Sequence, residues 1–186
     1  MKKKGIWVVI AVIVVILALC IGQYNGLVSK QEAVENQMSN VQVQLQRRSD
    51  LIPNLVNTVK GYAKHETEVY ESIADARAKM AGATTPDEMV EADGELTQAL
   101  GRLFAVAEAY PQLNSNENYL ELQDQLEGTE NRISTARRDY NETVKSYNTK
   151  IRSFPTNIFA KILGFEKYEL FQASAEAQNA PTVNFD

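Results

Sequence analysis

The densest group of side chains that could do chemistry lies in the stretch RRSDLIPNLV, residues 47–56. Arg47, Arg48 and Asp50 precede Pro53, which is followed by Asn54. Guanidinium groups bind phosphate and carboxylate through paired hydrogen bonds, so this stretch could contact an anionic ligand or a partner. The alternative is structural: an Arg–Asp pair, or hydrogen bonds at a helix end with Asn54 as the cap, would steady a kink at Pro53. We favour the structural alternative.

The chain has a single histidine, His65, which is followed by Glu66 and lies near Glu68. These side chains could bind a metal ion or supply a general base. A paired Glu-x-x-His di-iron site needs two histidines and is therefore excluded. Adjacent residues also point to different faces of a helix, so His65 and Glu66 are poorly placed to ligate one ion. We favour solvated or capping roles and predict no metal site.

No other catalytic arrangement is visible in the sequence. One histidine without a nucleophile elbow gives no sign of a catalytic triad, and a glycine-rich phosphate loop is missing. The only cysteine, Cys20, lies in an apolar stretch, where its thiol would be protonated and inert. We predict a protein that is not an enzyme and has no cofactor. Its candidate ligand or partner contacts are Arg47, Arg48, Asp50, Asn54 and His65.

Two Tyr-Asn pairs, at 140–141 and 147–148, lie seven residues apart next to Arg137 and Arg138. Tyrosines at core positions need partners for their hydroxyl groups. An internal polar layer that fixes the register of the helices satisfies this need, and we favour it over a ligand pocket.

The elements that position these groups are predicted to be helices. Apolar residues recur with helical, two-per-heptad spacing at Leu27, Val34, Met38, Val41, Leu45 and Ile52. Pro53 removes an amide and disfavours helical geometry at Ile52, which predicts a kink or break there. The apolar face then continues to about Met80, and Gly82 is expected to end the helix with a left-handed cap.

The start of the next helix is marked by Thr85, Pro86 and Glu88, the pattern of a capping box with proline at the first helical position. Tyr110-Pro111 is expected to end it. A third helix carries a seven-residue repeat at Tyr119, Leu126, Ile133, Tyr140, Tyr147 and Phe154, with Asn114 or Ser115 as its cap. Residues 156–163 predict a short closing helix with Gly164 at its C-cap.

Residues 5–22 read GIWVVIAVIVVILALCIG and contain no charge and no proline. A helix of this length spans roughly 27 Å, close to the roughly 30 Å of bilayer hydrocarbon. The basic head at Lys2–Lys4 and Trp7 provide the expected interfacial anchors. A cleaved signal peptide or a lipoprotein signal at Cys20 is the alternative, but Leu17 and Leu19 are too bulky for such cleavage sites.

The charge distribution bears on orientation and partners. The three lysines of the head predict a cytoplasmic N-terminus and an exported domain, although Lys30, Arg47 and Arg48 lie on the other flank. Without the head, 16 basic residues remain against 24 acidic residues, from totals of 19 and 24. This acidic balance excludes nucleic acid as a partner and predicts repulsion from anionic lipid headgroups.

These patterns predict an all-α protein: a basic head (1–4), a transmembrane helix (5–22), an antiparallel bundle of three to four helices (23–164) and a tail (165–186) that is mobile from about residue 172.

Several strings in the chain resemble the bacterial LemA family in the same order. They are RRSDLIPNLV (47–56), VKGYA (59–63), His65-Glu66, YPQL (110–113), TENRI (129–133), Ala136-Arg137, the two Tyr-Asn pairs and Phe154-Pro155. The resemblance covers nearly the whole chain. It implies a single-pass membrane protein with a long helical bundle and no established catalytic residues.

The function expected from the sequence is that of a non-enzymatic scaffold or interaction module in a bacterial cell membrane. Its partners would be membrane lipid, through the N-terminal helix, and another membrane or envelope protein or a second copy. The alternative is a membrane-tethered ligand sensor or hydrolase that uses the polar residues near Pro53 and His65.

Overall fold

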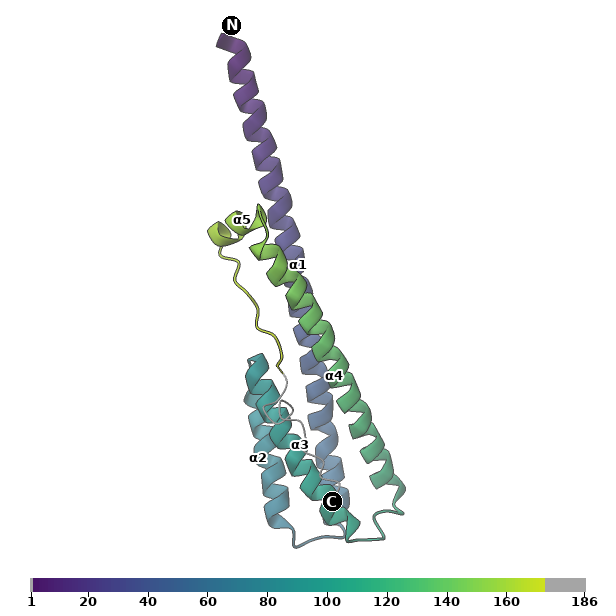
Figure 1. Ribbon diagram of the computed structural model, residues 1–186. Helices are drawn as coiled ribbons and strands as arrows, with labels where there is room; N and C mark the ends of the chain where they lie inside the picture. Colours follow the sequence, from purple (N-terminus) through teal and green to yellow (C-terminus); the bar gives the residue numbers. More distant parts are fainter. Residues whose placement is uncertain (1, 173–186) are drawn as a thin grey trace, which may run out of the picture. The chain divides into compact units, whose positions relative to one another are not determined.

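The computed structural model describes residues 2–172, and within them all regular structure is α-helical (Figure 1). This confirms the all-α fold with a long apolar N-terminal helix and a helical bundle. The five helices are α1 (Lys2–Lys60), α2 (Thr67–Gly82), α3 (Pro86–Glu108), α4 (Glu117–Arg152) and α5 (Thr156–Leu163). The most distal part of the predicted tail lies outside the described residues.

The chain divides into two compact units. The first, which we call the anchor unit, contains the residues up to Ser39 together with Asp139–Glu169. The second, the bundle unit, contains Asn40–Arg138 and the described residues from Leu170 onward. The bundle unit therefore holds the second part of α1, all of α2 and α3 and the first part of α4.

The sequence predicted a kink or break at Pro53, and the break is wrong, because α1 continues through this residue to Lys60. An interior proline costs about 3 kcal/mol through a lost hydrogen bond and a steric clash. Ile52 and Leu55 on either side are fully buried, and so is Val59 further along the helix. Because each such side chain contributes about 1.5–3 kcal/mol, their packing offsets the cost of the proline. The chain leaves the helix only at the link 61–66.

Helix α2 ends at Gly82 as predicted, but not with a left-handed residue. Ala83 follows in an extended conformation, with φ −69° and ψ 126°, because the chain passes directly into the cap of α3. In the described part of the chain, Gly164 is the glycine with positive φ, at 76°, and it caps α5 as predicted.

The capping box at the start of α3 is confirmed. The Thr85 hydroxyl accepts a hydrogen bond from the backbone N–H of Glu88, and the Glu88 carboxylate accepts from the backbone N–H of Thr85 at 3.1 Å. The same carboxylate also accepts from the backbone and the hydroxyl of Thr84. These bonds lower the pKa of Glu88 to about 2, with the Thr84 backbone as the largest cause.

The seven-residue repeat of α4 is buried at Tyr119, Leu126, Ile133, Tyr140 and Tyr147. Its last member, Phe154, is exposed. The N-terminal cap is Asn116, whose side-chain oxygen accepts from the backbone N–H of Tyr119 at 3.0 Å, and not Asn114 or Ser115 as predicted. The cap lies one or two residues closer to the repeat than predicted because a turn precedes it, in which the N–H of Asn116 donates to the Leu113 carbonyl.

The capping box predicts an acid-sensitive contribution to stability. The carboxylate form of Glu88 accepts the bonds, so its contribution is full above its ordinary pKa of 4.5 and is lost as the pH falls through about 2. We expect Glu88→Gln to lower the free energy of unfolding at pH 7 and to flatten its decline in that acid range. Urea unfolding of the full chain in detergent micelles measures both effects. Asp87→Asn, in the same helical turn, is the control, and an equal flattening there would contradict the assignment.

Candidate functional site

Arg48 occupies a core position of α1. It lies seven residues after Val41 and seven before Leu55, so the three side chains share one face of the helix. Val41 and Leu55 are fully buried, and Arg48 is only 5% exposed. The densest polar motif of the sequence thus places one of its two arginines among the packed apolar side chains of the bundle unit.

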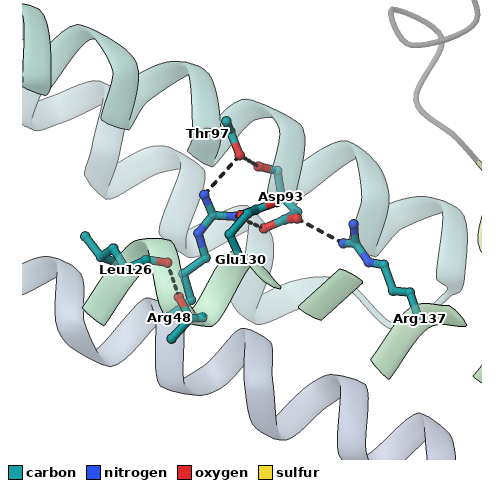
Figure 2. Close-up of polar contacts among 7 residues, drawn as sticks. Arg48, Asp93, Thr97, Leu126, Glu130 and Arg137 are labelled. Atoms are coloured by element: carbon teal, nitrogen blue, oxygen red, sulfur yellow. Dashed lines mark hydrogen bonds and ion pairs between the residues drawn. The ribbon is translucent and has the colours of Figure 1, made fainter. Parts of the chain in front are cut away.

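The buried guanidinium contacts side chains of two other helices (Figure 2). Its Nη1 forms ion pairs with Asp93 of α3 and, at 2.7 Å, with Glu130 of α4. Its Nη2 donates a hydrogen bond of 3.1 Å to the hydroxyl of Thr97. Asp93 also pairs with Arg137 of α4 at 3.0 Å. We call Arg48, Asp93, Thr97, Glu130 and Arg137 the buried polar network.

Asp93 occupies the equivalent core position of its own helix. Pro86, Asp93, Leu100 and Ala107 follow one another at intervals of seven residues, and all four are buried. Asp93, Thr97 and Glu130 were not predicted as site residues from the sequence, and Arg137 was predicted in a different role. The signal that would have found the central pair is a charged residue at a seven-spaced core position in each of two helices.

The network is balanced in charge and closed to solvent at its centre. Two arginines oppose an aspartate and a glutamate, and the side chains of Arg48 and Asp93 are 6% and 5% exposed. Arg137 is 20% and Glu130 50% exposed, so these two lie toward the surface. Because the charge of Arg48 is already neutralised by protein carboxylates, the group is suited to hold three helices together.

The other residues proposed from the sequence do not join Arg48. Arg47, Asp50 and Asn54 are exposed on one side of α1, where Asp50 accepts a hydrogen bond of 2.7 Å from Gln46. Asn54 lies inside the helix and therefore caps nothing. His65 is exposed in the link after α1. In residues 2–172, no cluster of three or more histidine, cysteine, aspartate or glutamate side chains could hold a metal ion.

The Tyr-Asn pairs of α4 bind a segment of the same chain within the anchor unit. Both polar atoms of the Asn148 side chain form hydrogen bonds with the backbone of Tyr168. Its Nδ2 donates to the Tyr168 carbonyl at 2.8 Å, and its Oδ1 accepts from the Tyr168 N–H at 3.1 Å. The Tyr140 hydroxyl donates to the Glu169 carbonyl at 3.0 Å, and burial raises the pKa of Tyr140 to about 12. The rings of Tyr147 and Tyr168 pack edge to face at 5.3 Å.

These contacts show what the polar side chains next to Tyr140 and Tyr147 do. They hold residues 165–169 against α4, so the first part of the predicted tail is a packed segment of the anchor unit. The hydroxyl of Tyr168 extends the contact to α1, where it donates to Glu35 at 3.0 Å.

The bundle unit has an open groove of about 540 Å³. It is lined by polar residues of α1, including Gln42, Gln46 and Ser49, and by alanines and Arg77 of α2. Arg77 reaches across it, with Nε donating to the Ser49 hydroxyl at 3.4 Å. The groove is therefore a surface feature separate from the buried polar network.

The model of the LemA family matches residues 37–185, which is most of the chain. The chain belongs to the LemA family. Two magnetosome proteins of Paramagnetospirillum magneticum strain AMB-1, MamQ 1 and MamQ 2, are each 32% identical to it in matches that cover 86% of this chain and 68% of theirs. Protein LemA of Metamycoplasma hominis is 29% identical, over 83% of this chain and 71% of its own.

The buried polar network of this LemA-family chain predicts a specific pattern of stabilities. Asp93→Leu removes the main partner of Arg48 and should cost about 3 kcal/mol, the lower end for a broken buried pair, because Glu130 still neutralises Arg48 in part. The double variant Arg48→Met/Asp93→Leu should recover most of this loss, since an apolar pair leaves no buried charge. Urea unfolding in detergent micelles measures both.

The exposed neighbour provides the control for this cycle. Arg47→Met should change the free energy of unfolding by no more than about 0.5 kcal/mol. Arg48→Met alone completes the cycle. If its loss and that of Asp93→Leu simply added in the double variant, the coupling between Arg48 and Asp93 would be refuted.

The amide of Asn148 predicts how the segment 165–169 is held. Asn148→Leu removes two hydrogen bonds and should release the segment, so that trypsin cleaves after the exposed Lys167 several times faster. Thr149→Ala, at the exposed neighbouring position, should leave the cleavage rate unchanged. Mass spectrometry of timed digests of the full chain gives the rates, and equal rates for both variants would contradict the role of Asn148.

Proposed function

We propose that this protein is a non-enzymatic scaffold, anchored in a bacterial cell membrane, whose helical domain binds another membrane or envelope protein or a second copy of the chain. The observation that carries the proposal is the buried polar network. The densest polar motif of the sequence directs its buried arginine to Asp93 and Glu130, where it joins helices instead of facing a substrate. Three other polar residues of the motif, Arg47, Asp50 and Asn54, are exposed and suited to contacts with a protein surface.

The proposed anchor is the apolar start of α1. One helix in the described part of the chain is long and apolar enough to cross a membrane. Its most apolar 18 residues have a mean hydropathy of 2.9, and none of them is buried. Side chains such as Ile6, Trp7 and Leu19 are more than half exposed, which suits contact with lipid. Because a signal sequence passes the same criteria, N-terminal sequencing of the mature protein is the direct test of permanent anchoring.

The proposed orientation places the N-terminus in the cytoplasm and the helical domain outside. It rests on the three lysines of the head, since basic residues remain on the cytoplasmic side of a membrane span. Protease treatment of intact cells should then degrade the helical domain. Protection of the domain in intact cells, with digestion after permeabilisation, would reverse the orientation.

The family relationship supports a non-catalytic role. The relatives carry the names magnetosome protein and Protein LemA, and neither name specifies a reaction. The MamQ relatives are named for the magnetosome, and we propose that this chain is likewise part of a larger assembly. We therefore place the partner in the same membrane or next to it.

Photo-crosslinking in intact membranes tests the scaffold proposal. A benzophenone side chain is placed at Arg47 on α1 or at Ala78 on α2, both of which are exposed. We expect irradiation to give discrete adducts with a membrane protein or with a second copy from at least one position, and none without irradiation. Recovery of monomer alone from both positions would remove the support for a scaffold.

A second experiment separates the scaffold from a ligand sensor or hydrolase. The triple variant Arg47→Ala/Asp50→Ala/His65→Ala changes exposed residues only, so its helicity and stability should remain near those of the wild type. In a scaffold that binds through a broad surface, the triple variant keeps its membrane partner in affinity purification. A folded triple variant that retains the partner but loses the cellular phenotype would instead favour the sensor or hydrolase.

A further inference from the structure

Helix α5 is buried on one face and exposes large apolar side chains on the opposite face. Thr156 and Ala160, one turn apart, are buried against the rest of the anchor unit. Ile158 and Ile162, also one turn apart, lie on the other side and are 50% and 75% exposed. Phe154, just before the helix, is 80% exposed. Large apolar side chains that are exposed opposite the packed face of a helix favour an apolar environment on that side.

The helix is attached to α1 at the point where the apolar run ends. The Thr156 hydroxyl and the side-chain oxygen of Gln23 form a hydrogen bond of 3.0 Å. Just after the C-terminal end of α5, the ring of Phe165 packs edge to face against the ring of Tyr24, with 6.0 Å between the ring centroids. Gln23 is the first residue after Gly22, the end of the charge-free run. Both ends of α5 are thus fixed beside the last turn of the proposed span.

The charge around α5 differs from that of the domain as a whole. From Lys150 to Tyr168 the sequence has four basic residues, Lys150, Arg152, Lys161 and Lys167, and one acidic residue, Glu166. A juxtamembrane surface of this sign is attracted to anionic lipid headgroups. The expectation that headgroups repel the domain therefore does not extend to this part of it.

We propose that α5 is an interfacial helix that lies on the same bilayer that the N-terminal helix spans, with Ile158 and Ile162 among the acyl chains and Lys161 at the headgroups. The occupant of its exposed apolar face is lipid, because the contacts with Gln23 and Tyr24 hold α5 at the end of the proposed anchor. The inference rests on the anchoring in the proposed function. It adds a second, reversible membrane contact that brings the end of α4 to the bilayer surface.

Quenching of a fluorescent label by brominated lipid tests this placement. The full chain is reconstituted into vesicles of phosphatidylethanolamine and phosphatidylglycerol that contain a phosphatidylcholine brominated near the top of its acyl chains. The wild type carries a bimane label on its single cysteine, Cys20. A second protein, Cys20→Ser/Ile162→Cys, carries the label on α5. The control, Cys20→Ser/Glu142→Cys, carries the label at an exposed position on α4, ten residues before that helix ends at Arg152.

We expect the labels at positions 20 and 162 each to lose about half or more of their fluorescence, because an interfacial helix buries its apolar face roughly 5–10 Å into the headgroup–acyl boundary. The label at position 142 should keep its fluorescence and remain accessible to aqueous iodide. Quenching at 20 but not at 162 would overturn the interfacial helix and leave the anchor intact. No quenching at 20 would overturn the anchor itself.

Two further outcomes decide against lipid as the occupant. A label at 162 that is shielded from both iodide and brominated lipid would show that protein covers the face of α5. Equal quenching at 142 and 162 would show that membrane contact is not specific to this helix. Either result overturns the proposal.

Discussion

A charged guanidinium cannot remain unpaired among apolar side chains, and Arg48 is held at such a place in α1. The bundle unit must therefore bring carboxylates to that point, and it does so with Asp93 of α3 and Glu130 of α4. A seven-residue repeat of apolar residues packs almost equally well after a shift of one heptad. The ion pairs do not tolerate such a shift, because a displacement of even one helical turn, about 5.4 Å, separates the guanidinium from its carboxylates. The network thus selects one register from the several that apolar packing allows.

Elements with a local cause could be predicted from the sequence. The capping box of α3 depends on Thr85 and Glu88, which are three residues apart, and the C-cap of α5 depends on Gly164 alone. The repeat of α4 likewise identifies its buried face without knowledge of its neighbours. The effect of Pro53 could not be predicted, since it depends on the packing of Ile52 and Leu55 against other helices. Local preference and tertiary packing oppose each other there, and packing prevails.

The same distinction between local sequence signals and long-range packing applies to the candidate site. The motif around Arg48 was visible, and so was a structural alternative based on an Arg–Asp pair, but Asp50 is not the partner. The partner, Asp93, lies 45 residues away, and only the arrangement of α1 and α3 brings the two together. Periodicity also has a limit at Phe154, which continues the repeat of α4 and is nonetheless exposed. A repeat identifies one face of a helix but not the material that covers it.

The contacts of Asn148 with the backbone of Tyr168 bear on how the protein is synthesised. Residues 165–169 follow α4 and α5 in the chain, so they leave the ribosome after the helices that they contact. Until they arrive, the amide of Asn148 lacks both of its backbone partners, and the ring of Tyr147 lacks the edge-to-face contact with Tyr168. A nascent chain stopped at the end of α5 would present this uncovered aromatic surface to chaperones and proteases. Closure of the segment thus distinguishes a finished anchor unit from a shortened product.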